Sequence, residues 1–431
     1  MSHRARQLKV SSLARVEGEG ALHVVVRDGE VERADLQIYE PPRFFEALLR
    51  GRSYTEPPDI TARICGICPV AYQTSACNAI EDACGVRVGG AIRELRRLLY
   101  CGEWISSHTL HVYLLHAPDF LGYPDAIALA TDHREIVERG LMLKKAGNAI
   151  LELVGGRAIH PINVRVGVFY EAQARAQLDR LAEQLRPALD AAIATVYWVA
   201  GFDFPDVELD HELLAVYDPA RYAIEGGTTL RRSAGPSFPV DAFSNHVVEE
   251  HVPHSTALHA SLDGGRYLTG PLARYTLNHE HLSPLALGLA AEVGLGSECR
   301  NPFRSIVVRA IETVYAVEEA LRLIESHEPP EPPYLAVPAR DGVGHGVSEA
   351  PRGLLYHQYE IGGDGLVRSA TIVPPTAQNQ AAIEDDLRRV VSANLELEDE
   401  RLTGLCEQTI RNYDPCISCS THFLDLTVER Q

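Results

Sequence analysis

The sequence predicts an α+β protein that is mainly helical, with a large helical core and with β-hairpins or small sheets near both ends of the chain. Three observations lead to this fold class. Long stretches of helical periodicity occupy the middle of the 431-residue chain, apolar and polar residues alternate near both ends, and 45% of the residues are hydrophobic. A chain of this length and composition can bury a sizeable core.

The first elements follow from local signals. Alternating residues on both sides of Asp28-Gly29 predict a β-hairpin, because this dipeptide suits a tight turn between strands. Pro69 is placed to open a helix and Gly85 to end it. Further helical patterns span 92–116, 132–153, 171–200 and 305–326.

The remaining segments are less regular. Residues 202–304 are rich in glycine, proline and aromatic residues, which predicts irregular connections with short strands. The proline-rich segment His327–Pro338 is the best candidate for an internal boundary. Beyond it, alternation around Gly362–Gly365 predicts a second hairpin, and a helix is expected from about 377 to 395.

Charge and cysteine content narrow the class of protein. A formal charge of −19 argues against nucleic acid or an anionic membrane surface as the main partner. The N-terminus has no apolar segment typical of a secretory signal, and no apolar run approaches the roughly 20 residues of a membrane helix. Nine cysteines do not resemble a small disulfide scaffold. We therefore expect a cytoplasmic, reduced protein whose paired cysteines bind metal.

Two C-x-x-C pairs lie almost at opposite ends of the chain, Cys65 with Cys68 and Cys416 with Cys419. A structural zinc site usually joins pairs about 12–20 residues apart, and a thioredoxin-type dithiol needs a short βαβ unit that neither pair has. A site that joins these distant pairs would be buried within a large domain, which favours a catalytic metal. Other cysteines, such as Cys77, fit core packing, since Val70, Cys77 and Cys84 recur every seven residues.

The residues around the cysteine pairs extend this interpretation. Together with other motifs in the same order, RICGIC and DPCISCSTH resemble the large, catalytic subunit of nickel–iron hydrogenases. The other motifs are LARVEGEG (13–20), RFFE (43–46), GGRAIHP (155–161), EAPRG (349–353) and PPTAQN (374–379). The resemblance covers the chain from about residue 10 to the end and implies the large-subunit fold of that family. It implies one domain over 1–422, β-rich at about 7–42, helical at about 44–326 and β-containing at about 333–422.

The resemblance also implies the metal ligands. Nickel would be bound by the thiolates of Cys65, Cys68, Cys416 and Cys419. Cys68 and Cys419 would also bridge to an iron that carries carbon monoxide and cyanide, and Thr376 is placed to hydrogen-bond a cyanide. A separate magnesium-like ion would be bound by Glu46, His422 and a backbone carbonyl near Ile372.

Three further residues receive roles from the same match. Arg352 matches an arginine whose guanidinium lies over the metal pair and stabilises charge as dihydrogen is split. Asp414 is a candidate partner of that guanidinium or a cap of the local backbone. Glu17 matches the proton-gate glutamate beside a terminal nickel thiolate, here Cys416, whereas Glu19 is expected to be an exposed strand residue.

Some nearby residues depart from the family or allow two interpretations. Tyr72 stands where many relatives have histidine, and Ser107 where many have aspartate. The spacing of His108 and His111 could suit a metal-binding face, but packing near the site is the favoured interpretation. Tyr72 and the run HVYLLHAPDFLGY favour the cytoplasmic, cofactor-coupled branch, which includes NAD(P)-linked and sulfur-reducing enzymes.

The chain has no further cysteine set that could carry electrons, since Cys101, Cys299 and Cys406 are isolated. The resemblance therefore implies an iron–sulfur small subunit and further electron-transfer subunits, which would hold the iron–sulfur clusters and the flavin or NAD(P). It also implies nickel-insertion factors and a maturation protease that removes residues 423–431. Two alternatives stay open from the residues alone: a hydrogen-sensing or assembly subunit with the same site, and a zinc-stabilised structural subunit.

Overall fold

The computed structural model describes residues 6–421, and helices dominate this part of the chain. The α-helices are α1 Phe45–Leu49, α2 Pro57–Thr61, α3 Pro69–Ala83, α4 Gly90–Leu110, α5 Ala117–Leu121, α6 Ala126–Asp132, α7 Arg134–Gly155, α8 Arg175–Ala200, α9 Phe243–His246, α10 Pro271–Asn278, α11 Pro284–Glu292, α12 Ser305–Ser326, α13 Pro375–Ala393 and α14 Asp399–Arg411. A π-helix, η2 (His111–His116), continues α4, and short 3-10 helices are η1 Ala62–Ile64, η3 Val240–Ala242, η4 His279–His281, η5 Pro302–Arg304 and η6 Ser418–Ser420.

The strands form small sheets on one side of the helices. They are β1 Arg6–Val10, β2 Gly20–Arg27, β3 Glu30–Ile38, β4 Val164–Arg165, β5 Val168–Phe169, β6 Glu212–Tyr217, β7 Thr229–Arg232, β8 Phe238–Pro239, β9 Val247–Glu250, β10 His259–Leu262, β11 Tyr267–Leu268, β12 Gly342–Ala350, β13 Gly353–Ile361 and β14 Val367–Val373. The sheets have the orders β1-β2-β3, β4-β5, β11-β6-β7-β8, β10-β9 and β12-β13-β14. Except for the parallel pair β11 and β6, the neighbouring strands are antiparallel.

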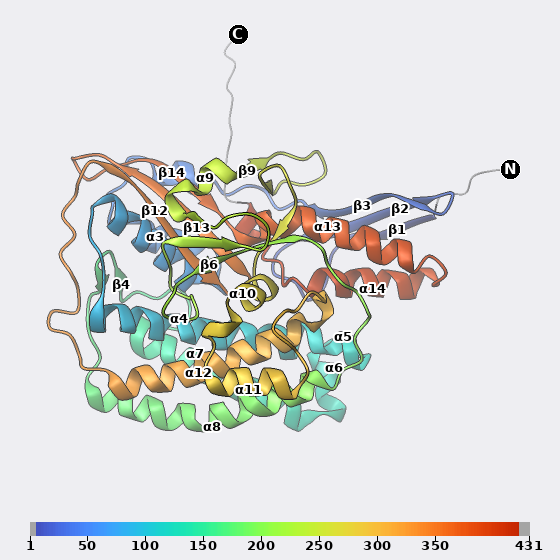
Figure 1. The fold of residues 1–431 in the computed structure, drawn as a ribbon, viewed down its shortest axis with the longest axis horizontal. Helices are drawn as coiled ribbons and strands as arrows, with labels where there is room; N and C mark the ends of the chain where they lie inside the picture. Colours follow the sequence, from blue (N-terminus) through green and yellow to red (C-terminus); the bar gives the residue numbers. More distant parts are fainter. Residues whose placement is uncertain (1–5, 422–431) are drawn as a thin grey trace, which may run out of the picture.

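The long helices pack against one another as a layer. In Figure 1, α4, α7, α8 and α12 lie together in the lower part of the molecule, while β12–β14 and β1–β3 lie above them. Helices α13 and α14 lie beside each other near β1–β3 (Figure 1). Within the described residues, no helix is long and apolar enough to cross a membrane.

The predicted fold class is confirmed, with differences at the level of single elements. The hairpin at Asp28-Gly29 forms, and both residues adopt positive φ angles of 54° and 82°. Val70, Cys77 and Cys84 are buried, as core packing required. Helices α10 and α11 were not predicted, because they are short segments next to proline- and glycine-rich stretches, and α14, a helix of 13 residues, was not predicted either. The assignment of one domain to residues 1–422 stays a prediction.

Helix α3 lies unusually close to the neighbouring sheet. Gly342, Gly344 and Gly346 alternate along β12 on the face that contacts α3. A Cβ atom at Gly344 would meet the backbone of Ala79 and Ala83 at distances that real Cβ atoms do not show. The backbone of α3 therefore rests directly on β12 without side chains between them, which fixes the start of α3 relative to the turn between β12 and β13.

Candidate metal centre

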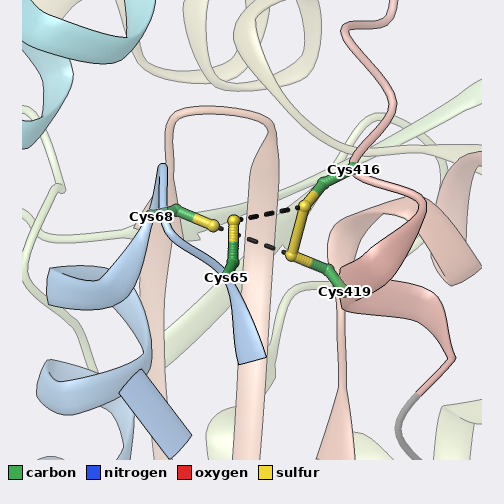
Figure 2. A group of neighbouring side chains, drawn as sticks. All are labelled: Cys65, Cys68, Cys416 and Cys419. Carbon is green, nitrogen blue, oxygen red and sulfur yellow. Dashed lines mark hydrogen bonds between the residues drawn. A yellow bond between two sulfur atoms is a disulfide. The ribbon is translucent and has the colours of Figure 1, made fainter. Parts of the chain in front are cut away.

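The two cysteine pairs meet at one buried point. Cys65 follows η1 and Cys68 immediately precedes α3, whereas Cys416 and Cys419 lie after α14. The Sγ atoms of Cys65 and Cys416 are 3.5 Å apart, those of Cys68 and Cys419 are 3.7 Å apart, and all four lie within 4.8 Å of one another. Figure 2 shows the sulfur atoms pointing toward a common centre from opposite sides.

A carboxylate from another helix fixes the first pair. Cys68 has no side-chain capping bond at the start of α3, and Pro69 removes one of the unpaired donors there. Glu103 on α4 accepts hydrogen bonds from the backbone N–H groups of Val70, at 2.6 Å, and Ala71, at 3.0 Å. Burial raises the pKa of Glu103 well above its usual value. Glu103 therefore caps the helix that begins next to Cys68, a role that the sequence did not indicate.

The second pair is held through its backbone. The N–H of Cys416 donates to Thr376 Oγ1 at 2.9 Å, and the N–H of Ile417 donates to the carbonyl of Glu17 at 3.0 Å. The Cys416–Glu17 contact forms a parallel β-bridge between segments from opposite ends of the chain. Thr376 thus lies at the centre, and its hydroxyl hydrogen remains available as a donor.

Arg43 connects the two cysteine segments, although the sequence suggested no role for it. Its backbone N–H donates to the carbonyl of Thr421 at 2.7 Å. Its guanidinium Nη2 donates to the carbonyl of Ile64 at 2.6 Å and also to that of Ser418. One arginine therefore bonds to the residue before Cys65 and to the residue before Cys419.

Arg352, in the turn between β12 and β13, is buried and paired with Asp414. Its Nε donates to the Asp414 backbone carbonyl at 2.8 Å and its Nη2 to Asp414 Oδ1 at 3.1 Å. Desolvation works against the charge, but Asp414 and the sulfurs of Cys68 and Cys65 hold the pKa of Arg352 above its ordinary value. Among the described residues, no acceptor contacts the buried Nη1 atom.

The first two thiols influence each other directly. A hydrogen bond with Cys68 lowers the pKa of Cys65, and the same bond together with burial raises the pKa of Cys68 well above its usual value. The Ile67 N–H also lies 3.3 Å from the Cys65 sulfur.

Glu17 contacts the second pair. Its Oε2 lies 3.1 Å from Cys416 Sγ and accepts a hydrogen bond from the backbone N–H of Ser418 at 3.1 Å. The Ser418 hydroxyl lies 3.1 Å from Glu40, a residue that reaches the surface. The carboxylate is thus within proton-transfer distance of one of the four sulfurs.

The donor set fits a soft transition metal. Four buried sulfur atoms converge, and a guanidinium with one unpartnered donor, Arg352 Nη1, lies beside them. The structure joins Cys416 and Cys419 by a disulfide, so a metal held by all four cysteines takes this pair in its reduced form. Thiolates are the ligands that nickel, iron–sulfur and zinc sites share, so the ligands alone do not select nickel.

The proposed magnesium-like site is only partly within the described residues. Glu46 Oε1 accepts a hydrogen bond from the backbone N–H of Ile372 at 2.7 Å, so the two residues are in contact, and their role as ion ligands stays a prediction. His422 and the segment 423–431 lie outside the described residues. Desolvation and the charge of Glu46 raise the pKa of Glu249, on β9, to about 8. Two carboxyl groups that repel each other are an arrangement that a divalent cation stabilises, and Glu249 was not singled out from the sequence.

The two residues that depart from the resembled family, Tyr72 and Ser107, belong to the protein interior that surrounds the four cysteines. The Tyr72 ring lies 5.7 Å from the ring of His357, and neither the Tyr72 hydroxyl nor the Ser107 hydroxyl has a hydrogen-bond partner in the described structure. His108 pairs with Glu312 at 3.1 Å and His111 contacts the carbonyl of Arg411 at 2.7 Å. Within residues 6–421 these histidines belong to no metal-ligand cluster, in agreement with the packing interpretation.

The overlooked residues had no usable sequence signal except at one position. Glu103 lies 35 residues from Cys68 and resembles any helical glutamate, and Glu249 lies in a region of short strands. Arg43 belongs to the motif RFFE, in which the resemblance implies a metal-binding role for Glu46 alone. A helix start at Pro69 without a capping side chain was the one indication that another element supplies an acceptor.

Comparison with known proteins gives a consistent result. The profile of a family described as nickel-dependent hydrogenase matches residues 43–171 and 304–422. The chain is 36% identical to the alpha subunit of sulfhydrogenase 2 from Pyrococcus furiosus over 97% of this chain and 100% of that one. It is 27% identical to the beta subunit of the NAD-reducing hydrogenase HoxS from Cupriavidus necator, over 97% and 95% of the two chains.

Solved structures share the fold. The crystal structure of an NAD+-reducing [NiFe]-hydrogenase in the H2-reduced state superimposes with a TM-score of 0.85, at 25% identity, over 97% of this chain and 99% of that chain. A Ni-Fe-Se hydrogenase from D. vulgaris Hildenborough superimposes with a TM-score of 0.78 at 23% identity, over 97% and 100% of the two chains. The helical core with small sheets is therefore that of hydrogenase large subunits.

Proposed function

The chain belongs to the nickel-dependent hydrogenase family, and from this premise we propose specific roles for the residues of the metal centre. As a large subunit of that family it is an oxidoreductase acting on H2, with the reaction H2 ⇌ 2H+ + 2e−. We propose that Cys65, Cys68, Cys416 and Cys419 would hold the nickel, and that Cys68 and Cys419 would also serve as ligands of the iron. The observation that carries this proposal is the convergence of four buried sulfur atoms from both ends of the chain.

The nickel–iron pair, with carbon monoxide and cyanide on iron, supplies the electrophilic centre at which dihydrogen is cleaved. The protein supplies a fixed positive charge beside it. Arg352 is held by two hydrogen bonds to Asp414, which leaves Nη1 directed away from this pair and without a partner among the described residues. A preorganised guanidinium of this kind stabilises developing negative charge without reorganising. Thr376 is close enough to offer its hydroxyl hydrogen to a ligand on iron.

Proton transfer would begin at the Cys416 sulfur. Glu17 Oε2, at 3.1 Å, is the carboxylate oxygen within reach of that sulfur, and the Ser418 N–H holds it in place. A general acid–base group must be within hydrogen-bond distance of the proton that it accepts. We therefore assign to Glu17 the first step of proton exit and to Asp414 the orientation of Arg352.

A magnesium-like ion would lie beyond this centre. We propose Glu46, the carbonyl of Ile372 and His422 as its protein ligands, with Glu249 close enough to Glu46 to be stabilised by the same cation. The ion would join α1 to β14 and to His422. Its role is therefore one of holding the cysteine segments together.

The electrons require partner subunits. We propose an iron–sulfur small subunit and further electron-transfer subunits, with NAD(P) as the final acceptor, which the NAD-reducing relatives support. A cytoplasmic location suits thiols that must stay free to bind metal. We also propose nickel-insertion factors and a protease that cleaves after His422. Nickel should bind whether or not residues 423–431 have been removed, whereas activity should require their removal.

The test is metal content and infrared spectroscopy on the complex purified anaerobically with its native partners. We expect one nickel per chain, iron in excess of nickel because the iron–sulfur partners also contain iron, and absorption bands from carbon monoxide and cyanide, which report the iron of the nickel–iron centre. Cys68→Ser should lose both metals, whereas Cys299→Ser, which alters another buried cysteine, should retain them. Zinc without these bands, even when the maturation factors are supplied, would refute the assignment of nickel to the four cysteines.

A further inference from the structure

A second group of metal-binding side chains lies away from the four cysteines. His254 is in the loop between β9 and β10, His259 is the first residue of β10, and Glu384 lies on α13. His254 Nε2 is 2.8 Å from Glu384 Oε1, and the two imidazole rings are 5.5 Å apart. One ligand atom from each residue lies within 4.8 Å of the others.

The backbone around these side chains is fixed by hydrogen bonds. Glu384 Oε1 also accepts from the backbone N–H of Leu36 on β3 at 3.0 Å, and Gln380, one turn earlier on α13, donates to the Leu36 carbonyl at 2.9 Å. In the loop, Thr256 donates its backbone N–H to the carbonyl of Ile38 at 2.8 Å. The three side chains are thus presented by elements anchored to the same strand.

The cluster has unused coordination capacity. His259 Nε2 is buried and has no hydrogen-bond partner in the described structure. Glu384 forms no ion pair with a lysine or arginine within residues 6–421, and the carboxylate of Asp35 acts electrostatically on both His259 and Glu384. Asp35 is itself paired with Arg33. The site therefore combines an imidazole nitrogen that has no partner in the described structure with one carboxylate, that of Glu384, that no described lysine or arginine neutralises.

A nearby cluster of similar composition gives a useful contrast. His211, Asp385 and Asp386 also lie together, but Asp385 pairs with Arg266 at 2.6 Å and with Arg389 at 3.0 Å. Arginines already balance the charge there, so that cluster is a hydrogen-bonded ion-pair network. The cluster of His254, His259 and Glu384 contains no such cation.

We propose that His254, His259 and Glu384 form a second metal site, which binds a divalent transition-metal ion such as Zn2+ through two imidazole nitrogens and one carboxylate. Such a ligand set is typical of zinc and related ions, with water in the remaining position. The site is separate from the thiolate centre and its existence does not depend on the proposed function.

The position of the site gives it a structural consequence. Ala257, between the two histidines, is fully buried and packs with Ile38 and with Ile417. Ile417 lies between Cys416 and Cys419. A metal ion at the second site would fix the loop 251–258 to α13, and the loop in turn forms the wall behind the second cysteine pair.

Cobalt provides the test, because its spectrum distinguishes nitrogen and oxygen ligands from sulfur. The assembled complex, with its thiolate centre filled, is treated with a chelator and then titrated with Co2+ in the presence of excess Mg2+, which keeps the proposed magnesium-like site filled. We expect one further equivalent to bind per chain, with weak visible bands and without the near-ultraviolet charge-transfer absorption of cobalt thiolates. In His259→Asn and Glu384→Gln the affinity for Co2+ should fall by more than about 100-fold. Losing a group that only hydrogen-bonds to a metal ligand already costs up to about 100-fold in metal affinity, and losing the ligand itself should cost more.

His246→Asn is the matched control. His246 is paired with Asp263 at 2.9 Å, and this pair has no third metal-binding side chain beside it in the described structure. The substitution therefore removes an imidazole from a histidine–carboxylate pair that is not a candidate metal site. This variant should bind Co2+ as the unchanged protein does. Uptake that survives both site variants, a thiolate-type spectrum, or no uptake by the unchanged complex would each overturn the proposal. The unchanged complex decides the outcome even where a variant does not fold.

Discussion

Replacing Glu103 by alanine tests whether a carboxylate on α4 holds the first cysteine pair in place. The substitution removes the acceptor of the Val70 and Ala71 N–H groups and leaves both donors buried. An unsatisfied buried donor costs about 1–3 kcal/mol, so opening the first turn of α3 should become easier by about 2–6 kcal/mol. Glu103→Gln keeps one acceptor oxygen, and we expect about half of this effect.

Hydrogen exchange followed by mass spectrometry measures this local opening. Because 1.4 kcal/mol corresponds to a factor of ten in an equilibrium, exchange across residues 66–76 should accelerate by at least about 20-fold in Glu103→Ala. The metal content should fall in parallel, since Cys68 adjoins the first turn of α3. Glu94→Gln is the control on the same helix, because Glu94 is partly exposed and pairs with Arg221, an interaction worth about 0–1 kcal/mol. Unchanged exchange at 66–76 in Glu103→Ala would refute the capping role.

Three further substitutions test other parts of the structure. Arg352→Lys keeps the charge but cannot form both hydrogen bonds with Asp414. The rate of H2 oxidation should therefore fall by about 100-fold at unchanged metal content. Equal turnover would exclude a role for the guanidinium. Gly344→Ala should lower the free energy of unfolding, measured with urea, by about 1–3 kcal/mol, because the added Cβ meets the backbone of α3. Gly363→Ala should leave this free energy unchanged, because a Cβ atom there has space. Desolvation raises the pKa of Glu319, but its hydrogen bonds and ion pairs with Arg322 and Arg97 outweigh this effect and lower the pKa from 4.5 to about 2. The stability from Glu319, about 3 kcal/mol, should be present above about pH 4.5 and be lost as the pH falls to 2, and Glu319→Gln should remove this dependence from urea midpoints measured across that range.

Local patterns predicted the elements whose stability is local. The turn at Asp28-Gly29 and the helix that begins at Pro69 depend on residues next to each other in sequence, and both form as expected. Arg352 became a candidate because it lies in a recognisable motif, although its partner Asp414 is 62 residues away.

The supporting residues escaped prediction because their contacts are not local. Glu103 accepts from a backbone N–H group 33 residues earlier in the sequence, and Arg43 bonds to the carbonyls of Ile64 and Ser418, which come from the two cysteine segments. Neither spacing nor residue type marks such a contact in advance. The glycines of β12 illustrate the same limit, since the helix α3 that they contact lies far away in sequence.

The distance in sequence between the two cysteine pairs has a consequence for biosynthesis. Cys65 and Cys416 meet across 351 residues. At about 5–20 residues per second, the first pair leaves the ribosome tens of seconds before its partners exist. During that time Cys65 and Cys68 offer only two of the four thiols, and Arg352, which lies beside the four sulfurs in the folded protein, has not yet been synthesised. Selectivity for the correct metal is therefore a property of the finished chain, and metal delivery has to wait until synthesis is complete.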